Sequence, residues 1–192
     1  MEGRLVEPLA RAVPTFITPG YTTLAAFICG LLVCVAAMSS AYKYISIYLW
    51  LANRFLDCRD GSLARSRNCA TELGGFLGLL NDFIIYSLLP IAVSVGQDPA
   101  SVSWTALALL EASFHINNFI LFYSAAVVAK RQADEVTSVT MRPAPVEGFE
   151  SGVIFTAMLI WPQHINLWMW GLSFGVFIGI CQRALAVTSI LS

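Results

Sequence analysis

Two carboxylates three residues apart, Asp57 and Asp60, are the residues of this chain best suited to chemistry. They lie in a chain with a mean hydropathy of +0.71, and lipid disfavours charged side chains that have no partner. In a helix each residue advances by about 100°, so the polar and small residues of this stretch would share one face. That face holds Asn53, Asp57, Asp60, Gly61 and Ala64.

A helix face of this kind is suited to binding metal ions. Carboxylate oxygens bind hard cations such as Mg²⁺, which often bridge the phosphates of a substrate. Gly61 and Ala64 are small, so a bulky group can lie against the helix beside the acids. The pattern predicts a site for a metal-bound, phosphate-bearing substrate. The alternative is a charged helix end at a membrane surface, in which the acids are solvated or paired with Arg59 and Arg65.

A third carboxylate, Asp82, follows in an apolar run and therefore needs a partner. Gly74, Gly78 and Asp82 are spaced four residues apart, so they would lie on one helix face. We expect the glycines to let this face pack closely on the preceding helix and to bring Asp82 to the metal-binding face. For Gly74 and Gly75 we expect a packing role rather than a catalytic one.

These residues resemble the signature of the CDP-alcohol phosphatidyltransferase family, D-x2-D-G-x2-A-R-x8-G-x3-D-x3-D. Every fixed position matches except the third Asp, where this chain has Gly78. The matching residues are Asp57, Asp60, Gly61, Ala64, Arg65, Gly74 and Asp82. Upstream, Thr18-Pro19 with Thr22 or Thr23 resembles the family's TPNxxT segment, with Gly20 in place of Asn. Downstream, Arg142-Pro143 and the segment 147–150 resemble the sequence before the fifth span in some bacterial members.

The resemblance implies transfer of a phosphatidyl group from CDP-diacylglycerol, or a related CDP-alcohol, to a small alcohol acceptor, with release of CMP and with Mg²⁺ or Mn²⁺ as cofactor. It implies the following roles: Asp57 and Asp60 as metal ligands; Gly61, Ala64 and Arg65 along the CDP moiety; and Asp82 as general base or metal-shell residue. Arg142, Glu147 and Glu150 are the acceptor-side candidates, although the two glutamates are equally suited to capping a helix.

The departure at Gly78 leaves two functional hypotheses. It removes an acid expected to ligate one or both metal ions of a dinuclear site. The first hypothesis is an active phosphatidyltransferase. The second is a catalytically impaired relative that binds a nucleotide-lipid or a membrane partner.

Composition independently predicts a membrane protein. Hydrophobic residues make up 57% and charged residues 12% of the 192 residues, against about 45–50% and about 25% in soluble domains. The net charge of −1 gives no basic patch for nucleic acid. We predict an all-α fold, a single domain (1–192) with a bundle of six transmembrane helices. The spans are expected at about 21–39, 44–64, 73–96, 101–129, 149–162 and 165–188, after a juxtamembrane segment (1–15) that is either a short interfacial helix or a disordered tail.

The distribution of cations predicts the orientation in the membrane. With a cytoplasmic N-terminus, the basic residues of the connections fall on the cytoplasmic side, and Lys43 stands alone on the other side. Those basic residues are Arg4, Arg11, Arg59, Arg65, Arg67, Lys130, Arg131 and Arg142. We therefore expect both termini and the active site in the cytoplasm, where an alcohol and a nucleotide can reach the acids. We also expect contact with membrane lipid and consider a homodimer.

Overall fold

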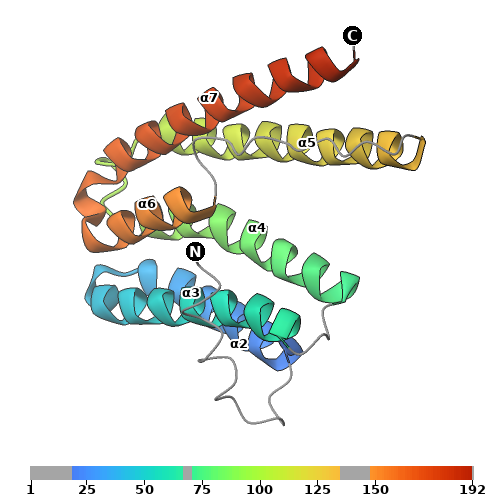
Figure 1. The fold of residues 1–192 in the computed structure, drawn as a ribbon. Coiled ribbons are helices and arrows are strands. Elements are labelled where there is room, and N and C mark those ends of the chain that lie inside the picture. Colours follow the sequence, from blue (N-terminus) through green and yellow to red (C-terminus); the bar gives the residue numbers. More distant parts are fainter. Residues whose placement is uncertain (1–18, 67–70, 135–147, 192) are drawn as a thin grey trace. The chain divides into compact units, whose positions relative to one another are not determined.

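The computed structural model describes residues 19–66, 71–134 and 148–191, and these ranges are helical apart from short connections (Figure 1). Six α-helices follow one another along the described chain. They are α2 (Pro19–Ala37), α3 (Lys43–Ser66), α4 (Glu72–Val95), α5 (Trp104–Asp134), α6 (Gly148–Ile160) and α7 (Ile165–Leu191). Short 3₁₀ turns at Ser40–Tyr42 and Pro162–His164 precede α3 and α7. The prediction for residues 1–15 lies outside the described residues.

Local sequence signals explain where the helices begin. Thr71 caps α4, because its Oγ1 accepts a hydrogen bond of 3.0 Å from the Gly74 amide. Ser103 caps α5 in the same way, at 3.3 Å from the Ala106 amide. Asn166, at the start of α7, also binds the segment that leads into α5. Its Oδ1 accepts a hydrogen bond from the Ser103 amide, and its Nδ2 donates one to the Ser101 carbonyl, both at 2.8 Å. Helix α5 therefore begins a few residues later than the predicted span.

Four described helices are long and apolar enough to cross a membrane, over Gly20–Ala37, Glu72–Val95, Trp104–Val127 and Pro162–Thr188. Helix α3 is continuous, but charged residues divide its apolar sequence. The apolar part of α6, Ser151–Ile160, is shorter than the ~20 residues that a bilayer requires. The all-α, polytopic membrane fold is confirmed by these helices. Six spans stay a prediction.

The first of two compact units covers residues 1–99. In it, α2 packs against both α3 and α4. Val33, Trp50, Ile85 and Leu89 are buried at these contacts. Gly30 marks a close approach of these helices: a Cβ there would lie 2.7 Å from the Ile85 side chain and 3.1 Å from Asn53 Nδ2. A glycine of α2 therefore lets residues of α3 and α4 come close to its backbone.

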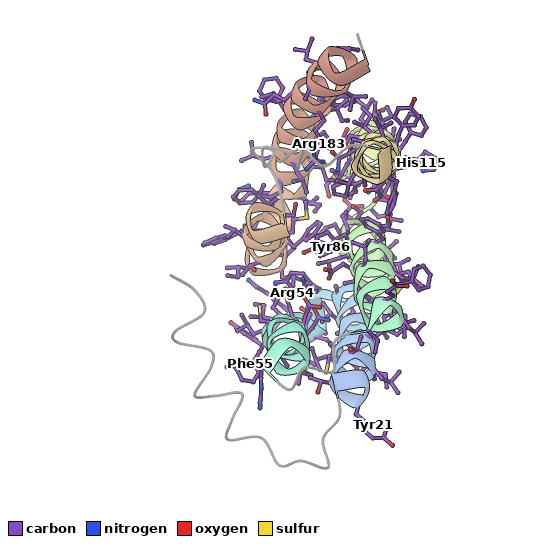
Figure 2. The ribbon with its side chains drawn as sticks, turned by 45° about the vertical axis from the view of Figure 1, so that its right-hand side comes forward. Tyr21, Arg54, Phe55, Tyr86, His115 and Arg183 are labelled. Carbon is purple, nitrogen blue, oxygen red and sulfur yellow. The ribbon has the colours of Figure 1, made fainter. Side chains whose placement is uncertain are left out.

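The second unit covers residues 100–192, and in it α7 packs against α5 and α6. Phe114 of α5 and Phe155 of α6 meet edge to face, with ring centroids 6.4 Å apart. Arg183 of α7 points toward α5 (Figure 2), where its Nη1 donates a 2.6 Å hydrogen bond to Asn117 Oδ1. Two polar side chains of these apolar helices thus pair within the unit. The single-domain prediction for 1–192 stays a prediction.

Candidate active site

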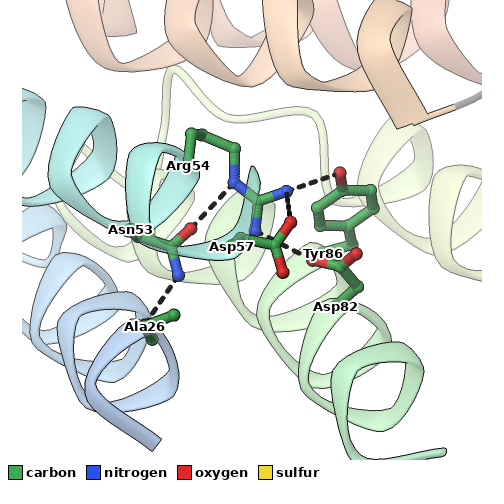
Figure 3. Close-up of polar contacts among 6 residues, drawn as sticks. All are labelled: Ala26, Asn53, Arg54, Asp57, Asp82 and Tyr86. Carbon is green, nitrogen blue, oxygen red and sulfur yellow. Dashed lines mark hydrogen bonds and ion pairs between the residues drawn. The ribbon is translucent and has the colours of Figure 1, made fainter. Parts of the chain in front are cut away.

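Two carboxylates of the signature, Asp57 on α3 and Asp82 on α4, face the same cation, the guanidinium of Arg54 (Figure 3). Arg54 Nη2 donates a 2.8 Å hydrogen bond to Asp82 Oδ1. Its Nη1 lies 3.6 Å from Asp57 Oδ2. A charge-assisted bond of the first length is among the stronger polar contacts in proteins. The fold therefore brings together two signature acids that lie on different helices.

Arg54 is also held by neutral groups. Its Nε donates to Asn53 Oδ1 at 2.8 Å, and its Nη1 donates to the Tyr86 hydroxyl at 3.0 Å. The guanidinium lies over the rings of Trp50 and Tyr86, 4.8 and 5.4 Å from their centroids. Arg54 and Tyr86 point toward each other, whereas Phe55, the next residue, points away (Figure 2).

Asn53 connects this cluster to α2. Its Nδ2 donates a 2.7 Å hydrogen bond to the Ala26 carbonyl, and the residue is 2% exposed (Figure 3). A buried amide must find such partners, since an unmet hydrogen bond costs about 1–3 kcal/mol. The absence of a side chain at Gly30 leaves room beside Asn53 Nδ2. Groups on three helices thus fix the position of the guanidinium.

The cluster remains open to water or a ligand. The side chains of Arg54, Asp57 and Asp82 are 23%, 28% and 30% exposed. One positive and two negative side chains leave a formal charge of −1 at this point. The surplus negative charge favours a further cation.

The other predicted site residues are placed only in part. Helix α3 continues through Ser66, so Asp57, Asp60, Gly61 and Ala64 do share a helical segment, as the predicted face requires. The side chains of Asp60, Gly61, Ala64 and Arg65 lie outside the described part of the chain, as do Arg142 and Glu147. Glu150 belongs to the first turn of α6, with its side chain likewise outside the described part.

Packing of the α4 glycines on α3 is not seen among the described residues. A Cβ at Gly75 or Gly78 would have no described atom within 4 Å, and one at Gly74 would meet only Thr71 Oγ1 at 3.2 Å. The close glycine contacts of this unit, among the described residues, are at Gly30 and at Gly96, where a Cβ would meet the Ala37 carbonyl oxygen. The physical reason is that α4 packs on α2 through residues after Asp82, such as Ile85 and Leu89, whereas the residues before it are mostly exposed.

Sequence reasoning missed Arg54 and Tyr86. Both have a simple signal: Arg54 precedes Asp57 by three residues, and Tyr86 follows Asp82 by four. Residues at these separations are neighbours on a helix. An acid in an apolar segment calls for a search for a cation one turn away.

The donors described here fit a hard divalent cation in their chemistry. Asp57 and Asp82 offer carboxylate oxygens at one partly exposed point. Within residues 19–66, 71–134 and 148–191, no group of three or more His, Cys, Asp or Glu side chains is arranged to hold a metal.

Comparison with known proteins agrees with the signature. The model of the family described as CDP-alcohol phosphatidyltransferase matches residues 16–184. The chain is 34% identical over 121 residues to the inner membrane protein YnjF of Escherichia coli K12, a match that covers 62% of this chain and 55% of that protein. The chain thus spans little more than half the length of this relative.

A solved structure shares the fold. The crystal structure of Mycobacterium tuberculosis phosphatidylinositol phosphate synthase (PgsA1) with CDP-DAG bound superposes with a TM-score of 0.70. The sequence identity is 18%, and the match covers 94% of this chain and 92% of the other. At this identity the likeness concerns the arrangement of the helices.

Proposed function

Since the chain belongs to the CDP-alcohol phosphatidyltransferase family, we propose that it is an integral membrane enzyme of phospholipid synthesis. It transfers a phosphatidyl group from CDP-diacylglycerol, or a related CDP-alcohol, to a small alcohol acceptor and releases CMP. The observation that carries this proposal is the convergence of Asp57 and Asp82, two acids of the family signature, at one partly exposed point.

In the reaction, an acceptor hydroxyl oxygen forms a bond to the phosphorus that carries diacylglycerol. The bond between that phosphorus and the bridging oxygen breaks, and CMP leaves with the electron pair. Asp82 accepts the proton of the hydroxyl. Because Arg54 binds Oδ1 of Asp82, we assign the proton to Oδ2.

Asp57 and Asp60 hold Mg²⁺ or Mn²⁺ in this proposal. When bound, the ion offsets the charge of the diphosphate and stabilises the leaving CMP. Gly61 and Ala64 give the CDP moiety room to approach α3, and Arg65 pairs with its phosphates. Arg142, Glu147 and Glu150 border the acceptor, and the site faces the cytoplasm.

The test is an assay of CMP release by the purified protein in detergent, with CDP-diacylglycerol, Mn²⁺ or Mg²⁺ and a panel of labelled alcohols. We expect metal-dependent CMP release and transfer of label to lipid with at least one acceptor. Asp57→Asn should lose this activity. An absence of CMP release across a broad acceptor panel, under conditions where CDP-diacylglycerol binds, would contradict the proposal.

One observation favours a second candidate, a non-catalytic relative. Gly78 stands where the signature has an acid, and Arg54 already pairs with two of the acids that remain. Such a protein would bind CDP-diacylglycerol in the same assay without releasing CMP.

A further inference from the structure

We propose that Arg54 is a built-in cation of the carboxylate cluster and that it limits this chain to one divalent ion. The proposal rests on the proposed function for the identity of the site. It assigns a role to a residue that lies outside the family signature. Its evidence is the geometry around the guanidinium and the charge of the cluster.

The guanidinium of Arg54 is held in a fixed position. Its Nε, Nη1 and Nη2 contact Asn53, Tyr86 and Asp82, at 2.8, 3.0 and 2.8 Å. Two of these three partners are neutral, and Asn53 is itself tied to the Ala26 carbonyl. The guanidinium is planar and is already held by several hydrogen bonds, so the side chain loses little further conformational entropy when it pairs with an acid. The position of the positive charge is thus built into the fold.

The positive charge of Arg54 lies directly beside the carboxylates of Asp57 and Asp82. Asp57 Oδ2 and Asp82 Oδ1 are 3.6 and 2.8 Å from the two terminal nitrogens of Arg54. A divalent ion bound between these same oxygens would stand against the guanidinium. Like charges at a few ångströms repel strongly when the side chains are partly removed from water. The region between Asp57 and Asp82 is therefore taken by Arg54.

The net charge of the cluster also limits the number of cations that it can bind. Among the described side chains of the cluster, Asp57 and Asp82 carry two negative charges and Arg54 carries one positive charge, which leaves −1. One divalent ion brings this sum to +1, whereas two would bring it to +3, and so strong a surplus of positive charge opposes binding of the second ion. One turn before Asp82 on α4, the signature acid is replaced by Gly78, where a Cβ would meet no described atom within 4 Å. The loss of a carboxylate at position 78 and the presence of the Arg54 guanidinium both make the net charge of the site more positive.

The experiment counts bound Mn²⁺ on the full chain in detergent, without lipid or nucleotide, from the loss of the free-ion electron paramagnetic resonance signal. We expect one Mn²⁺ per chain. Arg54→Gln should bind its first ion about tenfold more tightly, because a repulsive charge is removed. The double variant Arg54→Gln/Gly78→Asp should bind two ions.

Arg59→Gln is the matched control. It removes the same charge from the same helix, but the guanidinium of Arg59 lies over the Phe55 ring, 5.2 Å from its centroid. Arg59→Gln/Gly78→Asp should still bind one ion. Arg54→Lys keeps the positive charge but lacks the planar guanidinium and its several hydrogen-bond donors. This variant should bind one ion with nearly the affinity of the unmodified chain, and it should melt at a lower temperature.

The proposal is overturned if the unmodified chain binds two ions or none, if Arg54→Gln leaves the affinity unchanged, or if Arg54→Lys gains a second ion. Should Arg54→Gln unfold in metal-free buffer, its melting is measured with Mn²⁺ present. We then expect the ion to restore folding, and a failure to do so counts against the proposal. CMP release is scored separately, so a wrong metal count and a wrong enzymatic function give different results.

Discussion

The guanidinium of Arg54 and the carboxylate of Asp82 join α3 to α4 through a charge-assisted hydrogen bond of 2.8 Å. Both side chains retain some exposure, so the bond combines a structural link with access from outside. Asp57 lies beside the same guanidinium, 3.6 Å from its nearer nitrogen. The link between the helices and the candidate site are thus the same group of residues.

This bond should be measurable as a coupling between the two residues. We predict that Arg54→Gln and Asp82→Asn each lower the free energy of unfolding. In a double-mutant cycle the pair should show a coupling of about 1–2 kcal/mol, since the charges are only partly removed from water. The measurement is denaturant unfolding in detergent at a fixed pH with metal removed. Strictly additive effects would mean that the two groups do not depend on each other.

Gly30 should tolerate no side chain, in contrast to Gly75. We predict that Gly30→Ala destabilises the protein by about 1–3 kcal/mol, because the added Cβ would press on Ile85 and Asn53 and force them to shift. Gly75→Ala, with no described atom within 4 Å of the new Cβ, should be neutral or stabilising by up to about 1 kcal/mol. Thermal unfolding of the two variants side by side is the check. Equal losses would place a close contact at Gly75 as well.

Hydropathy and turn residues predicted the helices well. Each of the six expected spans overlaps one helix, and most ends differ by only a few residues, because apolar segments in lipid must satisfy their backbone hydrogen bonds internally. The end of α5 departs furthest: the helix continues through Lys130 to Asp134, past the apolar stretch. Hydropathy cannot locate such an end, since a helix that leaves the membrane can continue in water.

The pairing of side chains between helices was harder to predict. Helical spacing assigned Asp57 and Asp82 to one face each of two successive helices, and the structure shows both carboxylates beside the guanidinium of Arg54. The pattern Gly74, Gly75, Gly78 indicated close packing, but a small-residue pattern does not specify which helix is the partner or whether there is one. Gly30 does not belong to a repeated small-residue pattern and was overlooked, although it makes a close contact. Arg54 was overlooked because it lies outside the signature.

Asp60 should be essential for metal-dependent ligand binding. We predict that Asp60→Asn abolishes divalent-ion-dependent binding of CDP-diacylglycerol and leaves the protein folded, because the carboxylate supplies oxygen ligands that an amide replaces poorly. Calorimetry in detergent with and without Mn²⁺ gives the result, and thermal unfolding verifies the fold. Unchanged binding would remove Asp60 from the metal site.

Ala64 should report on the approach of the nucleotide. Ala64→Leu adds bulk on the face of α3 that carries Asp57 and Asp60, so we predict weaker binding of CDP-diacylglycerol, by about tenfold, with little loss of stability. Binding and melting are measured on the same sample. If melting collapses while the folded fraction binds normally, Ala64 serves helix packing instead.

Gly78 offers the most direct test of whether the lost acid matters. It lies one turn before Asp82 on α4, and a Cβ there would meet no described atom within 4 Å, so an Asp can be introduced without displacing described neighbours. We predict that Gly78→Asp raises the affinity for Mn²⁺ and raises the rate of CMP release by about tenfold or more, because each ligand to a metal in phosphoryl transfer contributes charge stabilisation. Gly75→Asp, which adds the same charge to the same helix on a neighbouring line of residues, is the control and should change neither quantity by as much. If the unmodified chain already turns over rapidly and Gly78→Asp slows it, the site works with the acids that it has, and position 78 is not the place of a missing ligand.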